Sequence, residues 1–257
     1  MSLRWQWCAS LCTQDFPVAA YEQLRQQVPQ ATPFNRLSWL QGAERALDHR
    51  HLQILLGWHG QRLVLCLPLT LGRETRAGLR LQVVRHLGHP LSDRLALLVA
   101  DPAQGAMPEV LEQIRRQLPH DLLQLHELVD AEGLLAPWCR ASWYSEQALS
   151  CRAPEHLIVD SDREEATGTL RYELRRAKKR CAEIDARVIR MAPQADGMDG
   201  VLEMLREVEQ ASWKGADGLG IFSGELRWQW MASALRGLAA EGLSLIHISE
   251  PTRLRRI

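Results

Sequence analysis

The sequence predicts an α+β protein, an α/β sandwich in which mixed, mostly antiparallel sheets are flanked by helices. Three observations lead to this class. The 257 residues are 46% hydrophobic and 24% charged, as in an ordinary globular domain. Short apolar runs bounded by turn residues alternate with longer segments whose apolar residues recur at helical spacing. These segments fall into two groups, so we expect a domain at residues 1–152 and a second, incomplete domain at 153–242.

The first domain is expected to begin with two helices. A β-hairpin follows them, and further strands follow the hairpin. His59-Gly60 separates two β-type runs, and Gly60 can adopt a positive φ, which favours a tight turn. Pro68 cannot donate a ladder hydrogen bond, so we place it at a sheet edge or strand end. The periodicity predicts helices over 16–27, 36–47 and 107–118, strands over 52–58, 61–69, 79–87, 94–100 and 122–128, and a loop over 88–93.

The second domain is expected to be mainly helical in the part that is present. Asp160-Ser161-Asp162 is typical of a helix start, because short polar side chains cap the first backbone N–H groups. The pattern predicts strands over 157–159 and 187–191, helices over 163–182, 200–213 and 225–240, and a glycine-rich loop over 214–224.

Charge and composition exclude several classes of protein. Lys+Arg and Asp+Glu both number 31, so the chain is not a general polyanion binder, although a local basic patch is compatible with this balance. No apolar run reaches the ~18 residues of a membrane span. The N-terminus is interrupted by Arg4 and Gln6 and does not resemble a signal peptide. The six cysteines include no C-x-x-C pair, so we expect reduced thiols and a soluble, cytoplasmic protein.

The last fifteen residues look foreign to the protein. Residues 243–253, LSLIHISEPTR, resemble the translation of a transposon-end adapter used to prepare sequencing libraries. We therefore expect 243–257 to be a non-native tail and the native sequence to continue differently after residue 242. The alternative is a natural C-terminal segment. The tail is left out of the fold prediction, as any processing scar would be.

The densest chemical feature is the basic segment RYELRRAKKR at residues 171–180. On a helix, Arg171, Arg175 and neighbouring lysines project near one another. Such a face suits phosphates, an anionic sugar or RNA. The alternative is a solvated helix face balanced by nearby glutamates. No recognised nucleic-acid motif accompanies the segment, so sequence-specific nucleic-acid binding is not expected.

Two other segments invite a functional interpretation. Trp213 and Lys214 open a G-x-x-G-x-G string, but a helix rather than a strand precedes it, which argues against a nucleotide loop and for a flexible loop beside a cleft. Trp213 is equally compatible with a core position at a helix end. The pairs His49/His51 and His86/His89 lack the spacing of a zinc site, so we expect no metal.

Five segments in order resemble one family. They are PFNRLSWLQG at 33–42, LVLCLPLTL at 63–71, LGHPLSDRLALLV at 87–99, LRYELRRAKKR at 170–180 and ASWKG at 211–215. Together they are similar to the CelD/FemAB-like branch of the GNAT acyltransferase superfamily, which is associated with cellulose and exopolysaccharide biosynthesis. The resemblance spans about residues 33–242. It implies tandem GNAT-like domains with the active cleft between them.

The resemblance also implies a reaction and site roles. It implies transfer of an acyl group from a CoA thioester, acetyl-CoA or another acyl-CoA, to an amine of a small molecule or glycan precursor. Asp93 would orient or deprotonate that amine, Arg171 and Arg175 would hold an anionic group, and Trp213 and Lys214 would shape the mouth of the cleft. The element that binds the CoA pyrophosphate is expected after residue 242, so we expect this chain to be inactive by itself.

Two alternatives stay open at this stage. FemAB relatives use aminoacyl-tRNA to build peptidoglycan cross-bridges, and the basic segment would suit tRNA as well as CoA phosphates. The chain is also compatible with a non-catalytic GNAT-like binding module that holds a glycan or a partner protein.

Overall fold

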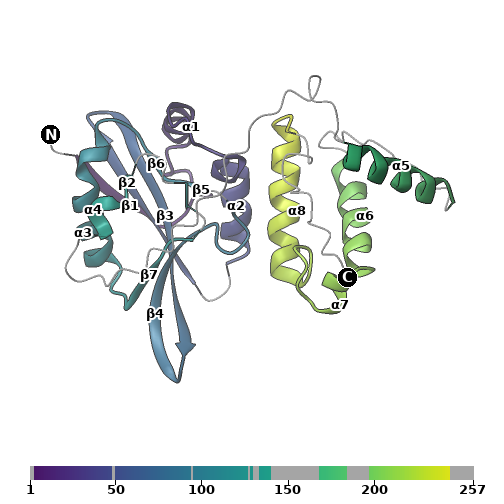
Figure 1. Ribbon diagram of the computed structural model, residues 1–257. Helices are drawn as coiled ribbons and strands as arrows, with labels where there is room; N and C mark the ends of the chain where they lie inside the picture. Colours follow the sequence, from purple (N-terminus) through teal and green to yellow (C-terminus); the bar gives the residue numbers. More distant parts are fainter. Residues whose placement is uncertain are drawn as a thin grey trace. The chain divides into compact units, whose positions relative to one another are not determined.

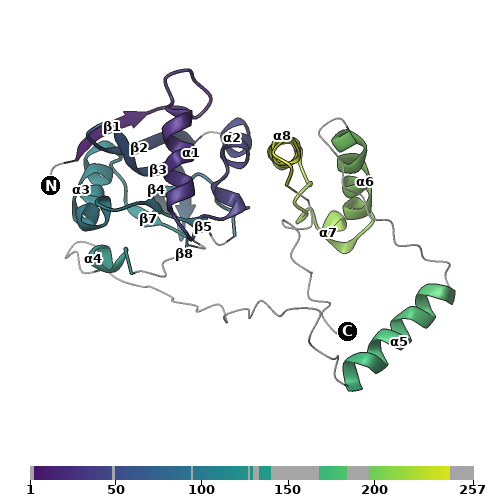
Figure 2. The same ribbon diagram turned by 90° about the horizontal axis from the view of Figure 1, so that it is seen from above.

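The computed structural model describes residues 3–47, 50–93, 95–126, 128–129, 133–139, 168–183 and 197–243. The chain divides into two compact units, Met1–Ser145 with Pro193–Ile257, and Glu146–Ala192. The first unit contains a mostly antiparallel sheet with helices on both faces (Figures 1 and 2). The α+β class with helix-flanked sheet is confirmed. The expected boundary between residues 152 and 153, like the strands over 157–159 and 187–191, lies outside the described residues.

Among the described residues, six strands form the main sheet in the order β1-β2-β3-β4-β7, with β6 beside part of β3. All its pairs are antiparallel except β4 with β7, and β5 and β8 form a separate parallel pair. The strands are β1 (Arg4–Cys8), β2 (His51–His59), β3 (Arg62–Arg76), β4 (Leu79–His86), β5 (Leu95–Ala96), β6 (Leu98–Val99), β7 (Leu122–Gln124) and β8 (Leu128–Val129).

The predicted hairpin at His59-Gly60 is confirmed, and a second one follows it. β2 and β3 are joined by a two-residue turn in which Gly60 has a φ of 61°. β3 runs on to Arg76 and turns into β4 through Ala77 and Gly78, with φ values of 48° and 82°. Two successive positive φ angles match the twist of paired strands. The sequence analysis missed this turn because Ala rarely adopts a positive φ.

The prediction that Pro68 lies at an edge or strand end is wrong. Pro68 lies in the middle of β3, opposite Ile54 of β2, and its carbonyl accepts a hydrogen bond from Leu87 N at 3.0 Å. The N and O of one strand residue point to the same side, so the missing N–H faces away from β2. There β3 changes its partner from β6, at Leu65 and Cys66, to β4. No ladder donor is therefore lost.

Two other predicted strands are divided in the structure. Residues 94–100 form β5 and β6, which belong to different sheets, and residues 122–128 contain β7 and the start of β8. Both segments are apolar and alternate as strands do, but periodicity carries no information about where a strand leaves one partner for another.

The helices that were predicted agree with the structure to within a few residues over the described part of the chain, except that a predicted loop begins with a short helix. The short helix over residues 136–139 was not predicted. The helices are α1 (Val18–Gln27), α2 (Leu37–Arg45), α3 (Met107–Gln117), α4 (Ala136–Cys139), α5 (Gly168–Glu183), α6 (Met198–Gln210), α7 (Trp213–Ala216) and α8 (Glu225–Ala240). The helix expected over 200–213 ends at Gln210, and α7 opens the segment expected to be loop.

Each face of the sheet has its own hydrophobic core. On one face, α3 packs through Val110 and Ile114 against strand residues such as Leu67. On the other face, α1 and α2 cover the sheet, and Trp39 of α2 also packs on Trp230 of α8, with ring centroids 5.7 Å apart. Figure 1 shows α3 and the α1–α2 pair on opposite sides of the strands. α6 and α8 thus complete the core of the first unit.

Helices α2 and α8 cross closely and antiparallel, because glycines lie at the contact. A Cβ added at Gly42 would lie 2.9 Å from the backbone oxygen of Trp230, and one added at Gly237 would overlap Ser38. One end of the contact is joined by Glu241, which accepts hydrogen bonds from Arg36 at 2.8 Å and from Ser38 at 2.7 Å. The crossing holds α8 next to the sheet.

Replacing Gly237 by alanine is expected to lower the free energy of unfolding by about 2 kcal/mol, because the added methyl forces the two helices apart. Urea unfolding followed by circular dichroism measures this. Gly200 of α6 is the matched control, since it is exposed and nothing lies within 4 Å of an added Cβ. Gly200→Ala should leave stability unchanged or raise it. Equal effects of the two changes would contradict close packing at the crossing.

Within the second unit the structure describes α5. This helix has no buried residue over Gly168–Glu183, and Leu170, Tyr172 and Leu174 are all at least half exposed. The predicted basic helix over 163–182 is therefore confirmed from residue 168 onward.

Candidate functional site

Two of the segments that carry the family resemblance are joined by buried hydrogen bonds. Asn35 donates from its amide to Ala96 O at 2.8 Å and accepts from Ala96 N at 3.2 Å. Trp39 donates from its indole to Ser92 Oγ at 2.8 Å. Asn35, Trp39 and Ser92 are each at most 5% exposed. These contacts attach the start of α2 to the segment 92–96, and they fix the loop 88–93 in place.

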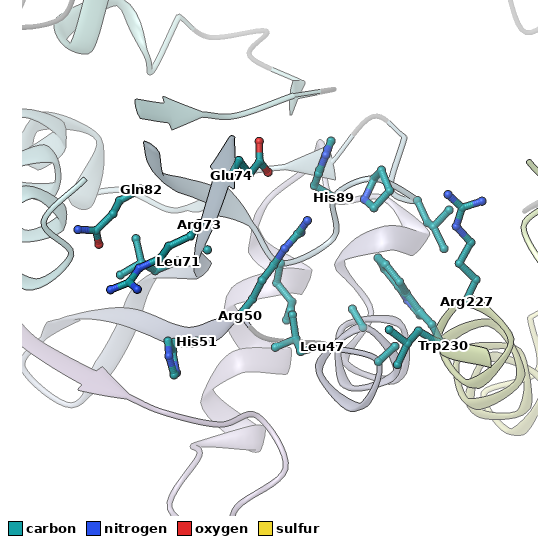
Figure 3. A pocket seen from close by; sticks show the side chains of 17 residues that line it. Leu47, Arg50, His51, Leu71, Arg73, Glu74, Gln82, His89, Arg227 and Trp230 are labelled. Atoms are coloured by element: carbon teal, nitrogen blue, oxygen red, sulfur yellow. The ribbon is translucent and has the colours of Figure 1, made fainter. Parts of the chain in front are cut away.

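That loop forms one wall of a pocket of about 790 Å³. The pocket lies within the first unit, between α2, α8 and residues of β2, β3 and β4. Its apolar lining includes Leu47, Leu71, Leu87, Leu91 and Trp230, and its charged or polar lining includes Arg50, Arg73, Glu74, Gln82, His89 and Arg227. In Figure 3 the Arg50 side chain projects through the middle of the pocket, between residues from β3 and residues from α8.

The carboxylate in the pocket is already neutralised by its neighbours. Glu74 forms an ion pair with Arg85, which is 7% exposed, and a second one with Arg76 at 3.1 Å. Gln124 accepts a further hydrogen bond from Arg85 at 2.9 Å. The hydrogen bond from Arg85 is the main reason that the pKa of Glu74 falls to about 2. Glu74 therefore stays ionised and does not serve as a base near neutral pH.

Two histidines near the pocket are uncharged at neutral pH. Burial lowers the pKa of His86 to about 3, and its Nδ1 accepts a hydrogen bond from Gly88 N at 3.0 Å. Desolvation, with smaller contributions from Arg85, His126 and Arg50, lowers the pKa of His89 to about 4. The ring of His89 stacks on His126 with centroids 5.1 Å apart. His89 is thus a neutral hydrogen-bonding group in the pocket wall.

The guanidinium groups of the pocket arginines form fewer hydrogen bonds and ion pairs than that of Arg85. The guanidinium groups of Arg50 and Arg73 have no side-chain hydrogen bond or ion pair with a residue that the structure describes. Arg227 donates to Gly220 O at 3.1 Å and keeps its other donors. The indole N–H of Trp230 is buried and also lacks a partner within the described chain. The site therefore has an excess of donors and of positive charge.

Asp93, the predicted acid–base residue, lies beside the pocket wall but does not line the pocket. It is exposed, next to the buried Ser92. The pocket-lining members of the same loop are His89, Pro90 and Leu91.

Trp213 and Lys214 are together in α7 and are likewise not pocket residues. Trp213 is 66% exposed, which excludes the core position, and the Lys214 ammonium lies 5.9 Å from its ring centroid. The loop that follows is held by Glu209, which accepts hydrogen bonds from Ile221 N at 2.7 Å and Phe222 N at 2.8 Å.

Arg171 and Arg175 are exposed on α5 in the second unit. The structure thus brings Trp213 and Lys214 together and keeps Arg171 and Arg175 on one helix. Of the predicted site residues in the first unit, Asp93, Trp213 and Lys214 are not among those that line the pocket.

The pocket residues that the sequence analysis missed gave only a weak signal. Arg73 and Glu74 are charges that follow the predicted strand 61–69 and that the structure includes in the exposed end of β3. No sequence signal marked Arg50 and Arg227 as site residues, because they line the same pocket only when α8 packs against α2.

Comparison of the chain with protein-family models, with curated proteins and with solved structures finds no match. Over the residues that the structure describes, no group of three His, Cys, Asp or Glu side chains is arranged to hold a metal ion. No helix in that part of the chain is long and apolar enough to cross a membrane.

Proposed function

We propose that this chain belongs to an acyl-CoA-dependent N-acyltransferase and that the pocket beside α2 and α8 holds the acyl acceptor. The observation that carries the proposal is the network of Asn35, Trp39 and Ser92. These residues come from two of the segments on which the family resemblance rests, and their hydrogen bonds build the pocket wall. Segments that a family shares in order are expected to meet at its site.

The chemistry asks little of the protein. A thioester is already activated, so positioning an uncharged amine near its carbonyl supplies most of the acceleration. Asp93 keeps the proposed role of accepting the amine proton from the pocket edge. The CoA pyrophosphate would need free backbone N–H groups at a helix start. Helix α3 is not suited to it, because Pro108 lacks an N–H and Glu109 adds negative charge to the first turn.

A non-catalytic binding module is the second candidate, and the proton chemistry of the pocket favours it. The pKa of Glu74 is about 2 and that of His89 about 4, so both are weak bases at neutral pH. A pocket that holds a ligand without moving its proton has this character. The aminoacyl-tRNA alternative draws support only from the exposed basic face of α5.

The test is transfer of a mass-labelled acetyl group. The protein with its native continuation after residue 242, in place of the expected non-native tail, is incubated with [¹³C₂]acetyl-CoA and a set of amines that includes amino sugars, polyamines and a lysine peptide. The acceptors are then analysed by mass spectrometry. We expect an acetylated acceptor that depends on folded protein, with Asp93→Asn reducing its formation by about 10²-fold or more. Arg80→Gln, an exposed change on β4, is the control and should leave the rate unchanged.

Each outcome assigns a function. Acetylation supports the proposal. Transfer from charged tRNA but not from acetyl-CoA supports the aminoacyl-tRNA alternative. If neither donor reacts with any acceptor, the acyltransferase proposal fails for this chain and the binding module takes its place.

A further inference from the structure

The pocket combines positive charge with an apolar wall. Arg50, Arg73 and Arg227 contribute three guanidinium groups to the pocket. The carboxylate of Glu74 does not balance them, because it forms ion pairs with Arg85 and Arg76. His89 is neutral at physiological pH. The remaining lining is largely aliphatic, with the Trp230 ring from α8. Apolar lining with a few convergent polar groups is the usual character of a ligand site.

Arg50 is the best-placed cation. Its side chain is partly buried, and its aliphatic stem packs over Gly72 of β3, where an added Cβ would lie 3.1 Å from Arg50 Cγ. Its charge also contributes to the lowered pKa of His89, so the guanidinium lies near that wall. A guanidinium whose stem is already packed loses less conformational entropy when it binds an anion than a free surface arginine does.

We propose that this pocket binds an organic acid, with its carboxylate or phosphate on the guanidinium of Arg50 and its apolar body against Leu47, Leu91 and Trp230. Two oxygens of a carboxylate or a phosphate can accept two parallel hydrogen bonds from one guanidinium. The apolar residues of the wall partly exclude water, which strengthens this ion pair. The inference rests on the proposed function in taking the pocket as the acceptor site, and it defines that acceptor as an anion. Binding by itself does not need transfer.

Direct binding of three probes with the same aromatic body tests the proposal. The probes are 1-naphthyl phosphate, 1-naphthylacetate and the neutral 1-naphthylacetamide, each titrated calorimetrically into the intact chain. We expect at least one acid to bind and the amide to bind about tenfold more weakly or not at all. The acid that binds more tightly identifies phosphate or carboxylate as the headgroup. The affinity should also fall as salt is raised.

Variants locate the site. Arg50→Gln is expected to weaken binding of the preferred acid by about tenfold or more, and Arg50→Lys to weaken it less, because the charge stays while the fork is lost. Gly72→Ala should weaken it as well, since the new methyl displaces the Arg50 stem. Arg80→Gln is the matched control, an exposed arginine outside the pocket, and should bind as the unchanged protein does. Urea unfolding of each variant shows that it is folded.

The proposal is overturned if neither acid binds at millimolar concentration, if the amide binds as tightly as the acids, or if the folded Arg50 and Arg80 variants bind equally. Acid binding without any acyl transfer leaves this inference standing and removes only the proposed enzyme. Transfer to neutral amines without acid binding does the reverse.

Discussion

Replacing Asn35 by alanine is expected to lower the free energy of unfolding by about 4 kcal/mol, because two buried backbone groups of Ala96 lose their partner at once. The Asn35 amide binds both Ala96 N and Ala96 O, and the side chain also accepts a hydrogen bond from Thr32 N at 3.0 Å. With the side chain 2% exposed, water does not replace these bonds without opening the structure. Urea unfolding followed by tryptophan fluorescence and circular dichroism measures the loss.

Thr32→Ala is the control for this change. Its hydroxyl lies 3.3 Å from the Asn35 amide oxygen and takes part in the capping box of the short turn at Pro33–Asn35, so its removal leaves the bridge from Asn35 to Ala96 intact. We expect a loss of about 1 kcal/mol or less for Thr32→Ala. If Asn35→Ala costs no more than Thr32→Ala, the bridge does not hold the segment 92–96. Asn35→Ala should also weaken binding of the organic acid, because it loosens the pocket wall.

Stability is expected to fall as the pH is lowered from 6.5 to 4.5, with a slope from His86 alone that approaches about 1.4 kcal/mol per pH unit near pH 5. Burial holds the pKa of His86 at about 3 in the folded chain, against 6.5 when exposed. Between these values the unfolded chain binds a proton that the folded chain does not, so acid favours unfolding. Well above pH 6.5 the His86 ring is neutral in both states and this dependence disappears. His89, with a pKa of about 4, acts in the same direction but is less deeply buried than His86 and contributes less.

The Glu74 carboxylate does not obscure this window. Glu74, whose pKa is lowered to about 2 by Arg85, adds stability that is present above pH 4.5 and is lost as the pH falls toward 2. The His86 effect therefore stands apart from it. Urea unfolding at half-unit steps of pH gives the slope.

Two variants assign the slope to its residue. His86→Gln is expected to be less stable at pH 7, because the packed ring is lost, but to show a flatter profile between pH 6.5 and 4.5. His59→Gln, an exposed histidine at the first hairpin, should keep the original slope. The assignment is wrong if His86→Gln and His59→Gln have the same slope as the unchanged protein.

Local chemistry was sufficient to predict most elements of the first unit. The apolar spacing in α2 and α3 and the glycine turn at residue 60 act over a few residues, so they are visible in the sequence. Pro68 misled the prediction because its tolerance depends on a gap between β6 and β4, which are remote in the chain. The division of 94–100 into β5 and β6 has the same origin.

The sequence predicted the segments that support the wall of the candidate site. It did not predict the charged residues that line the pocket. The segments 33–42 and 87–99 were marked in the sequence, and the structure joins them through Asn35, Trp39 and Ser92. The predicted site residues, such as Asp93, Arg171 and Trp213, were selected because they lie in segments with a conspicuous local pattern. The pocket lining instead combines Arg50, Glu74 and Arg227, which are separated by up to about two thirds of the chain.

The sequence by itself determined the α+β class, the helices and the first hairpin, because hydrophobic period and turn chemistry are local properties. Only the tertiary structure decided which charges share a cavity and which are cancelled. Glu74 is neutralised because β3 and β4 bring Arg85 against it, and Arg50 faces the pocket because α8 closes on α2 through Gly42 and Gly237. Such contacts depend on how whole helices and strands pack together. The spacing of residues along one segment carries no information about that packing.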